Sequence, residues 1–202
     1  MAAKTVRLRE EDPRFQRSLT ALIDAITDQI DGVPLSDISI TRVVEAAGVT
    51  RPTFYQHFAD IPEAARRAAL VRLSSSFPIP APAAGPDDLR PQAIRDRITG
   101  HTEPVLSHLL AHRNFYLRVL EEATNVAFFE EIISFVGERL LPEVFELAAR
   151  GSDAARRELT VVTAGGVTWL VIRWLRGESD HDPAEMARRC ASIALMMMKT
   201  EA

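Results

Sequence analysis

The sequence predicts an all-α protein, and three observations support this prediction. The chain has 202 residues, of which 47% are hydrophobic and 26% are charged, proportions typical of a globular protein that buries a core of its own. Apolar residues recur at the three- and four-residue spacing of a helix, as in Phe15, Leu19, Leu22 and Ile26. No segment alternates apolar and polar residues as a half-buried strand does. We therefore expect helices along the whole chain.

Capping residues locate the first and fourth helices. Asp12, followed by a proline at the first helical position, can cap a helix that ends near Gly32. Asp60 and Glu63 have the spacing of a capping box, which predicts a longer helix that runs toward Leu73.

A proline-rich stretch divides the chain. Four prolines and a glycine lie within residues 77–90, which predicts a linker because such a segment can be neither helix nor central strand. The sequence thus predicts an N-terminal domain over residues 1–76 and a C-terminal domain over residues 91–202. In the C-terminal domain we expect helices near residues 90–110, 113–123, 126–149, 152–176 and 182–199. Pro104 and Pro142 are expected to kink or divide the helices that contain them.

Two short helices between these caps have the form of a helix-turn-helix. Ser39 can cap a helix over residues 40–46, and Thr50 can cap a second one that ends at His57. Gly48 lies in the tight turn between them, where a left-handed backbone suits glycine. The net charge of −4 gives no indication of nucleic acid, so a DNA-binding hypothesis depends on this local motif.

The full motif points to a known family. Residues 40–58 read ITRVVEAAGVTRPTFYQHF, with an Ala-Gly-Val turn, a polar residue after it and a Thr-Phe-Tyr-x-His-Phe run. This string resembles the N-terminal signature of TetR-family transcriptional regulators. The resemblance covers about residues 14–72, and beyond them it depends on length and helical content alone. It implies an N-terminal three-helix DNA-binding domain and a C-terminal helical domain that binds a ligand and dimerises.

The resemblance implies roles for individual residues. Contacts with the DNA backbone are implied for Thr41, Thr50, Tyr55 and His57. The residues nearest the base edges would be Arg51, Pro52, Thr53 and Gln56. From chemistry alone Arg51 is the best base reader, because a guanidinium can bridge O6 and N7 of guanine. Arg42 is expected to face solvent or phosphate, and Tyr55 either packs or reaches a phosphate. Ile61 stands where the family often has a phosphate-binding lysine, which leaves that contact in question.

The C-terminal domain contains aromatic and polar residues that suit either a ligand pocket or an ordinary core. Arg173 can orient a ligand or pair with a glutamate. The candidate ligand-binding residues are His108, His112, Phe115, Tyr116, Phe128, Phe135, Trp169 and Arg173.

Two C-terminal helices carry more apolar surface than one chain usually covers. The segment from Leu159 to Leu175 is apolar almost all round, and the last helix has a broad stripe rich in methionine. A symmetric four-helix interface between two copies would bury both surfaces, although the stripe can also cover the chain's own core. The candidate interface residues are Val162, Gly166, Met186, Cys190, Ile193 and Met197.

Little in the sequence indicates catalysis or a cofactor. His108 and His112 are four residues apart and His101 lies seven residues earlier, but Pro104 interrupts the segment and no cysteine is near. We therefore expect no metal, no cofactor and no catalytic residue, and we interpret Cys190 as a buried thiol.

The sequence is thus best explained as a DNA-binding regulator and not an enzyme. We expect a homodimeric repressor that binds a palindromic operator in double-stranded DNA and is released by a small molecule. The charged N-terminus and single cysteine predict a cytoplasmic protein that does not enter membranes. The alternative is an all-α small-molecule-binding protein or enzyme that has lost DNA binding. The effector, the operator, the regulated genes and the choice between repressor and activator are left open.

Overall fold

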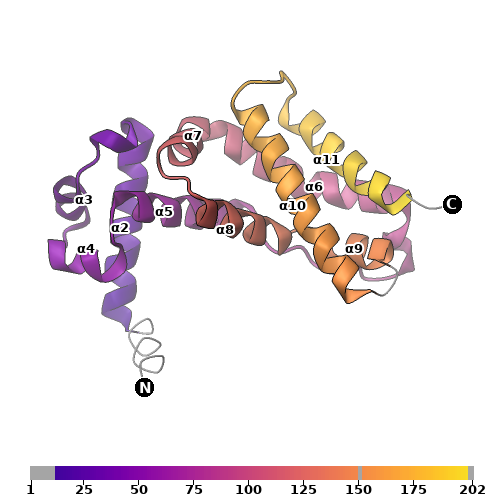
Figure 1. Ribbon diagram of the computed structural model, residues 1–202, viewed down its shortest axis with the longest axis horizontal. Helices are drawn as coiled ribbons and strands as arrows, with labels where there is room; N and C mark the ends of the chain where they lie inside the picture. Colours follow the sequence, from indigo (N-terminus) through magenta and orange to yellow (C-terminus); the bar gives the residue numbers. More distant parts are fainter. Residues whose placement is uncertain (1–11, 150–151, 200–202) are drawn as a thin grey trace. The chain divides into compact units, whose positions relative to one another are not determined.

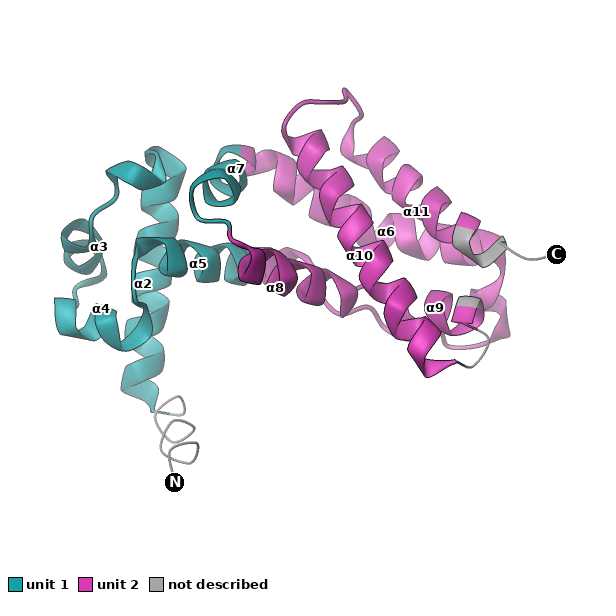
Figure 2. Cartoon of the chain, in the orientation of Figure 1, with its two compact units in different colours: residues 1–72, 114–124 teal, residues 73–113, 125–202 magenta. Residues whose placement is uncertain are grey.

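The computed structural model describes residues 12–149 and 152–199, and it confirms the all-α prediction (Figure 1). These described residues form α-helices and two short 3-10 helices joined by turns and loops, with no β-strand among them. Contacts within the chain divide it into two compact units (Figure 2). The first unit consists of the residues up to Arg72 and of Asn114–Thr124. The second consists of Leu73–Arg113 and of the residues from Asn125 onward.

The first unit is built on a long amphipathic helix. It contains α2 (Pro13–Gly32), η1 (Leu35–Asp37), α3 (Ile40–Ala47), α4 (Arg51–His57), most of α5 (Ile61–Ser76) and most of α7 (Arg113–Glu122). The Asp12 side chain caps α2 as predicted, because it accepts a hydrogen bond of 2.8 Å from the N–H of Arg14. Leu22, Ile26 and Ile30 on one face of α2 are fully buried.

Helix α7 lies in the first unit although it falls inside the predicted domain 91–202. The Arg118 guanidinium of α7 donates a hydrogen bond to the carbonyl of Ile30 at the end of α2. Arg66 of α5 donates to the carbonyl of Ala123, just after α7, at 3.1 Å. The boundary between the two compact units therefore differs from the predicted domain boundary at the proline-rich segment. The side chains of Arg118 and Arg66 attach α7 to the N-terminal helices.

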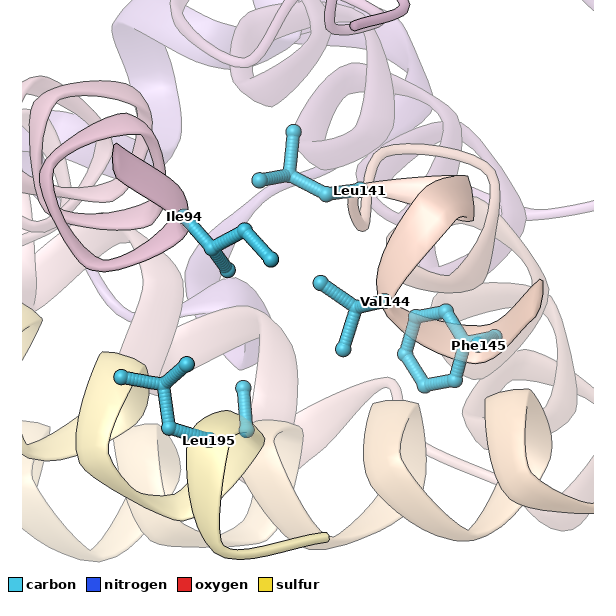
Figure 3. Packing of buried hydrophobic residues seen from close by; sticks show 6 residues of the cluster. Ile94, Leu141, Val144, Phe145 and Leu195 are labelled. Carbon is cyan, nitrogen blue, oxygen red and sulfur yellow. The ribbon is translucent and has the colours of Figure 1, made fainter. Parts of the chain in front are cut away.

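The second unit is a bundle of longer helices. It contains η2 (Pro86–Leu89), α6 (Pro91–Ala111), α8 (Val126–Gly137), α9 (Pro142–Ala149), α10 (Asp153–Leu175) and α11 (Pro183–Lys199). The most extensive packing is that of α11 on α6. Figure 3 shows part of its core, in which Ile94 of α6 and Leu195 of α11 meet Leu141, Val144 and Phe145 at the start of α9. The predicted helix over 126–149 is thus two helices, and the second begins at Pro142.

The proline-rich segment is attached to the second unit at two backbone carbonyls. Arg139 donates from Nε to the carbonyl of Phe77 at 2.7 Å, and Arg97 donates to the carbonyl of Ala81 at 2.7 Å. Arg97 also forms an ion pair with Glu143, whose side chain is buried. The segment lacks regular helix apart from η2, as its prolines predict, and the carbonyls of Phe77 and Ala81 accept hydrogen bonds from arginine side chains instead.

Candidate functional site

The turn between α3 and α4 is built around Gly48. Its backbone has a φ of 63° and a ψ of 32°, in the left-handed region that residues with a Cβ rarely adopt. Its N–H donates to the carbonyls of Val44 and Glu45, and the N–H of Val49 donates to the carbonyl of Val44 at 3.0 Å. These bonds end α3 and redirect the chain into α4, as the helix-turn-helix motif predicts.

The second helix of the motif, α4, begins at a side-chain cap. The Oγ1 atom of Thr50 accepts a hydrogen bond from the N–H of Thr53 at 3.4 Å and lies 2.9 Å from Oγ1 of Thr53. Phe54 is fully buried and Phe58 is 5% exposed, so one side of α4 is held against the core of the unit. Its other side is open to solvent.

The predicted base readers lie mainly on that open side. Arg51, Pro52 and Gln56 are exposed, and Thr53 is partly buried beside the cap. Their residue types supply a bidentate guanidinium, an amide and two apolar contacts for base edges. The exposed face of α4 therefore has the chemistry that sequence reading in a major groove needs.

The predicted backbone contacts divide into two groups. Thr41, Arg42 and Thr50 are exposed. The Tyr55 side chain is 53% exposed, with its ring edge-on to that of Phe54 at 5.7 Å between centroids. This position combines the two alternatives left open for Tyr55, since part of the ring packs while the rest reaches solvent.

His57 differs from the other predicted DNA contacts because it is partly buried and packs against α2. Its Nε2 atom lies 2.8 Å from Oγ of Ser18, and its ring lies 4.1 Å from that of Phe15 between centroids. Sequence reasoning missed Ser18. The available signal was a polar residue on the apolar face of α2 that also carries Phe15 and Leu22.

Ile61 begins α5 and is 8% exposed, so it belongs to the core of the first unit. The predicted capping box is present: the N–H of Glu63 donates to Asp60 at 2.7 Å, and the N–H of Ala59 donates to Glu63 at 2.6 Å. An apolar side chain here offers no cation for the phosphate contact that the family's lysine makes.

The candidate ligand-binding residues are distributed over both units. Phe115 and Tyr116 of α7 are buried in the first unit, where the Arg72 guanidinium lies 4.6 Å above the Phe115 ring. Burial raises the pKa of the Tyr116 hydroxyl well above its ordinary value. The two rings lie 5.1 Å apart in a T-shaped arrangement, which is typical of a packed core.

The other candidates lie in the second unit. His108 and His112 are adjacent, with ring centroids 4.7 Å apart, and Phe128 is buried. Phe135 lies under the Arg139 guanidinium, 3.6 Å from its carbon to the ring centroid. Arg173 forms an ion pair of 2.6 Å with Glu178, one of the two alternatives predicted for it.

The histidines do not form a three-ligand group. Nε2 of His101 lies 3.1 Å from the carbonyl of Arg139, to which it donates a hydrogen bond, and burial lowers the pKa of this imidazole. Within residues 12–149 and 152–199, no group of three or more His, Cys, Asp or Glu side chains is arranged to hold a metal ion.

The candidate interface residues separate into exposed and buried sets. Val162 is 70% exposed and Ile193 is 39% exposed, while Gly166 has open space beside it. Met186 and Cys190 are 1% and 5% exposed, because α11 turns these side chains into its own unit, so their assignment to a surface facing a partner is corrected. The side chain of Met197 lies outside the described residues.

Trp169, a candidate ligand-binding residue on α10, is exposed. Trp169 is 50% exposed and lies on the same helix face as Val162 and Gly166. By length and composition this helix is apolar enough to cross a membrane, and 33% of the apolar stretch is buried within the chain. It is the one such helix in the part of the chain that the structure describes.

The chain was compared with protein families, curated proteins and solved structures. Residues 96–195 match a TetR family model that is described as the C-terminal region of a transcriptional regulator. Among solved structures, NalD from Pseudomonas aeruginosa, described as the secondary repressor of the MexAB-OprM multidrug efflux pump, is 18% identical, with a TM-score of 0.48. The match covers 90% of this chain and 96% of that one. A search of curated proteins gave no match.

Proposed function

Because the chain belongs to the TetR family of transcriptional regulators, we propose that it is a repressor that binds a palindromic DNA operator and leaves it when a small molecule binds. DNA binding is supported above all by the contrast between the buried and the exposed side of α4. Buried Phe54 and Phe58 fix one side of this helix, and the exposed side presents Arg51, Pro52 and Gln56.

The geometry of α4 supports separate roles for these residues. Arg51 is exposed at the first position of α4, where its guanidinium can meet O6 and N7 of a guanine. Thr41, Arg42, Thr50 and Tyr55 are exposed near the same face and supply phosphate contacts. The residues that read sequence therefore lie on α4, and the residues that bind phosphates lie on α3 and on α4 with its cap.

We propose a homodimer formed through α10 and α11. Val161, Val162 and Trp169 are 59%, 70% and 50% exposed on α10, and Ile193 and Met196 are 39% and 65% exposed on α11. Apolar side chains of this size on two helices are normally covered by another molecule. A second copy is the favoured partner, since two linked helix-turn-helix motifs read a palindrome.

A structural link for ligand response is supplied by α7. This helix belongs to the first unit, yet the chain connects it directly to α6 and α8 of the second. Arg118 and Glu122 of α7 bind the backbone at the end of α2 and at η1. A ligand that favours one arrangement of α6 and α8 thereby acts on the DNA-binding unit, with an effect limited by its differential affinity for the two states. Candidate ligand contacts in the second unit are His108, His112, Phe128 and Phe135.

Selection of bound fragments from a genomic DNA library by the purified full-length chain tests this function. We expect one palindromic sequence to be enriched, with half-sites about one helical turn apart or a multiple of it. Binding should weaken steeply with salt, because phosphate contacts release counterions. A protein that enriches no sequence and shows no salt-dependent binding would instead be the ligand-binding protein without DNA function. As a regulator of transcription in this family, the protein is proposed to act in the cytoplasm.

A further inference from the structure

Ser18 on α2 makes two short polar contacts. The Ser18 hydroxyl donates to the carbonyl of Phe15 at 2.9 Å, and a hydroxyl has one proton to donate. Its Oγ atom also lies 2.8 Å from Nε2 of His57, within hydrogen-bond distance. Ser18 therefore joins the last residue of α4 to α2.

This contact lies at the end of α4 opposite to its cap. Thr50 and the Gly48 turn fix the start of α4 through bonds within residues 44–53. His57 is the last residue of α4, and it joins α2 through Ser18 and through its ring contact with Phe15. The orientation of α4 relative to α2 therefore depends on the contacts at both ends of α4.

Base reading is sensitive to the direction of this helix. With seven residues, α4 is about 10 Å long. A tilt of about 10° would displace one of its ends by nearly 2 Å, more than the tolerance of about 0.5 Å for a binding group. Loss of the contact at His57 would thus displace Gln56, the predicted base reader next to it, without removing that side chain.

We propose that Ser18 is a positioning residue that sets the specificity of DNA binding through His57. This inference rests on the proposed DNA-binding function. It assigns His57 to the orientation of α4 in place of the phosphate contact that the motif implies, because Nε2 of His57 already lies within hydrogen-bond distance of Ser18.

The test compares the variants Ser18→Ala, Ser18→Thr and Thr20→Ala in the full-length protein. Thr20 is a matched control, because its hydroxyl also donates to a carbonyl of α2, that of Gln16 at 3.0 Å, from an exposed position. Ser18→Thr keeps a hydroxyl that can bond within the helix. For each variant one measures circular dichroism, the base preference in DNA selection, and the affinity for the selected site and for random DNA.

For Ser18→Ala we expect about tenfold weaker binding of the selected site, the net effect of one hydrogen bond, with affinity for random DNA nearly unchanged. The base preference opposite Gln56 should relax. Ser18→Thr and Thr20→Ala should resemble the wild type. Equal losses on both DNAs, an unchanged site affinity, or the same loss in Thr20→Ala would overturn the proposal.

A second variant keeps the test informative if Ser18→Ala unfolds. His57→Gln retains a side-chain N–H donor and should leave the affinity for random DNA unchanged. If His57 instead contacts a phosphate, the affinities for the selected site and for random DNA should fall equally, which would overturn the proposal. A wild-type protein that selects no DNA contradicts the proposed function itself, and this result is visible before any variant is compared.

Discussion

The carboxylate of Glu122, the last residue of α7, accepts a hydrogen bond from the backbone N–H of Ser36 at 2.8 Å. Its other oxygen accepts from the N–H of Leu35 at 3.2 Å. The 3-10 helix η1 has no side-chain cap from Pro34, which precedes it, so a residue 86 positions away supplies the acceptors.

Replacement of Glu122 by alanine should therefore destabilise the first unit. We expect the free energy of unfolding to fall by about 1 kcal/mol, the net value of a hydrogen bond at a partly exposed site. Chemical denaturation checks this value. The neighbouring exposed Glu121→Ala is the control, and an equal effect of the two substitutions would contradict the capping role.

Arg51→Ala should weaken binding of the selected operator by about 1–3 kcal/mol and relax the preference at one base pair in each half-site. The reason is the exposed position of Arg51 at the start of α4. Repeating the DNA selection with the variant measures both effects. Arg42→Ala, an exposed arginine of α3, should instead reduce affinity for all sequences similarly, and a reversal of these two patterns would exchange the assigned roles.

Thr50→Ala should weaken binding of operator and random DNA alike. It removes the acceptor for the Thr53 N–H and a candidate phosphate contact, neither of which reads sequence. We expect a loss of about 1 kcal/mol in protein stability as well, measured by thermal unfolding. A loss of binding confined to the operator would assign Thr50 to base reading.

Paired substitution of Val162 and Ile193 by glutamate should yield folded monomers that no longer bind the operator. Both side chains are exposed on the single chain, so the charges disrupt a partner contact without entering the core. Sedimentation and circular dichroism distinguish dissociation from unfolding. Val126→Glu, at a position that is 77% exposed on α8, should remain dimeric. A dimeric double variant, or a wild type that is monomeric at micromolar concentration, contradicts this interface.

Stability should decline at alkaline pH because of Cys190. Burial raises the pKa of its thiol from 9.0 to about 11, so between these values the folded state retains a proton that the unfolded state releases. The free energy of unfolding then falls as pH rises through this window, by at most about 1.4 kcal/mol per pH unit. Denaturation of wild type and Cys190→Ala from pH 8 to 11 measures the difference. Parallel curves would show that the thiol does not contribute.

Local sequence was sufficient for the start of each helix in the helix-turn-helix region. Asp12, Ser39 and Thr50 cap the helices for which they were predicted, and Gly48 adopts the left-handed turn. These features could be predicted because a cap or a turn involves residues two to five positions apart. Residue type agrees with the two sides of α4, where Phe54 is buried and Arg51 is exposed.

Long-range packing could not be predicted in the same way. The sequence does not reveal that His57 bonds to Ser18, 39 positions away, or that α7 joins the N-terminal helices. It also overestimated the surface of α11, where Met186 and Cys190 are buried. An apolar stripe has the same period whether its own chain or a second copy covers it.

The sequence by itself determined the all-α class, the helix starts and the exposed chemistry of α4, because these follow from period, capping and residue type over one or two turns. The tertiary structure decided which apolar faces remain open, such as that of Val162 and Trp169, and which polar groups meet across the chain, such as Glu122 and Ser36. Such pairings depend on how whole helices pack, and burial is a property of the assembled unit, not of any one segment.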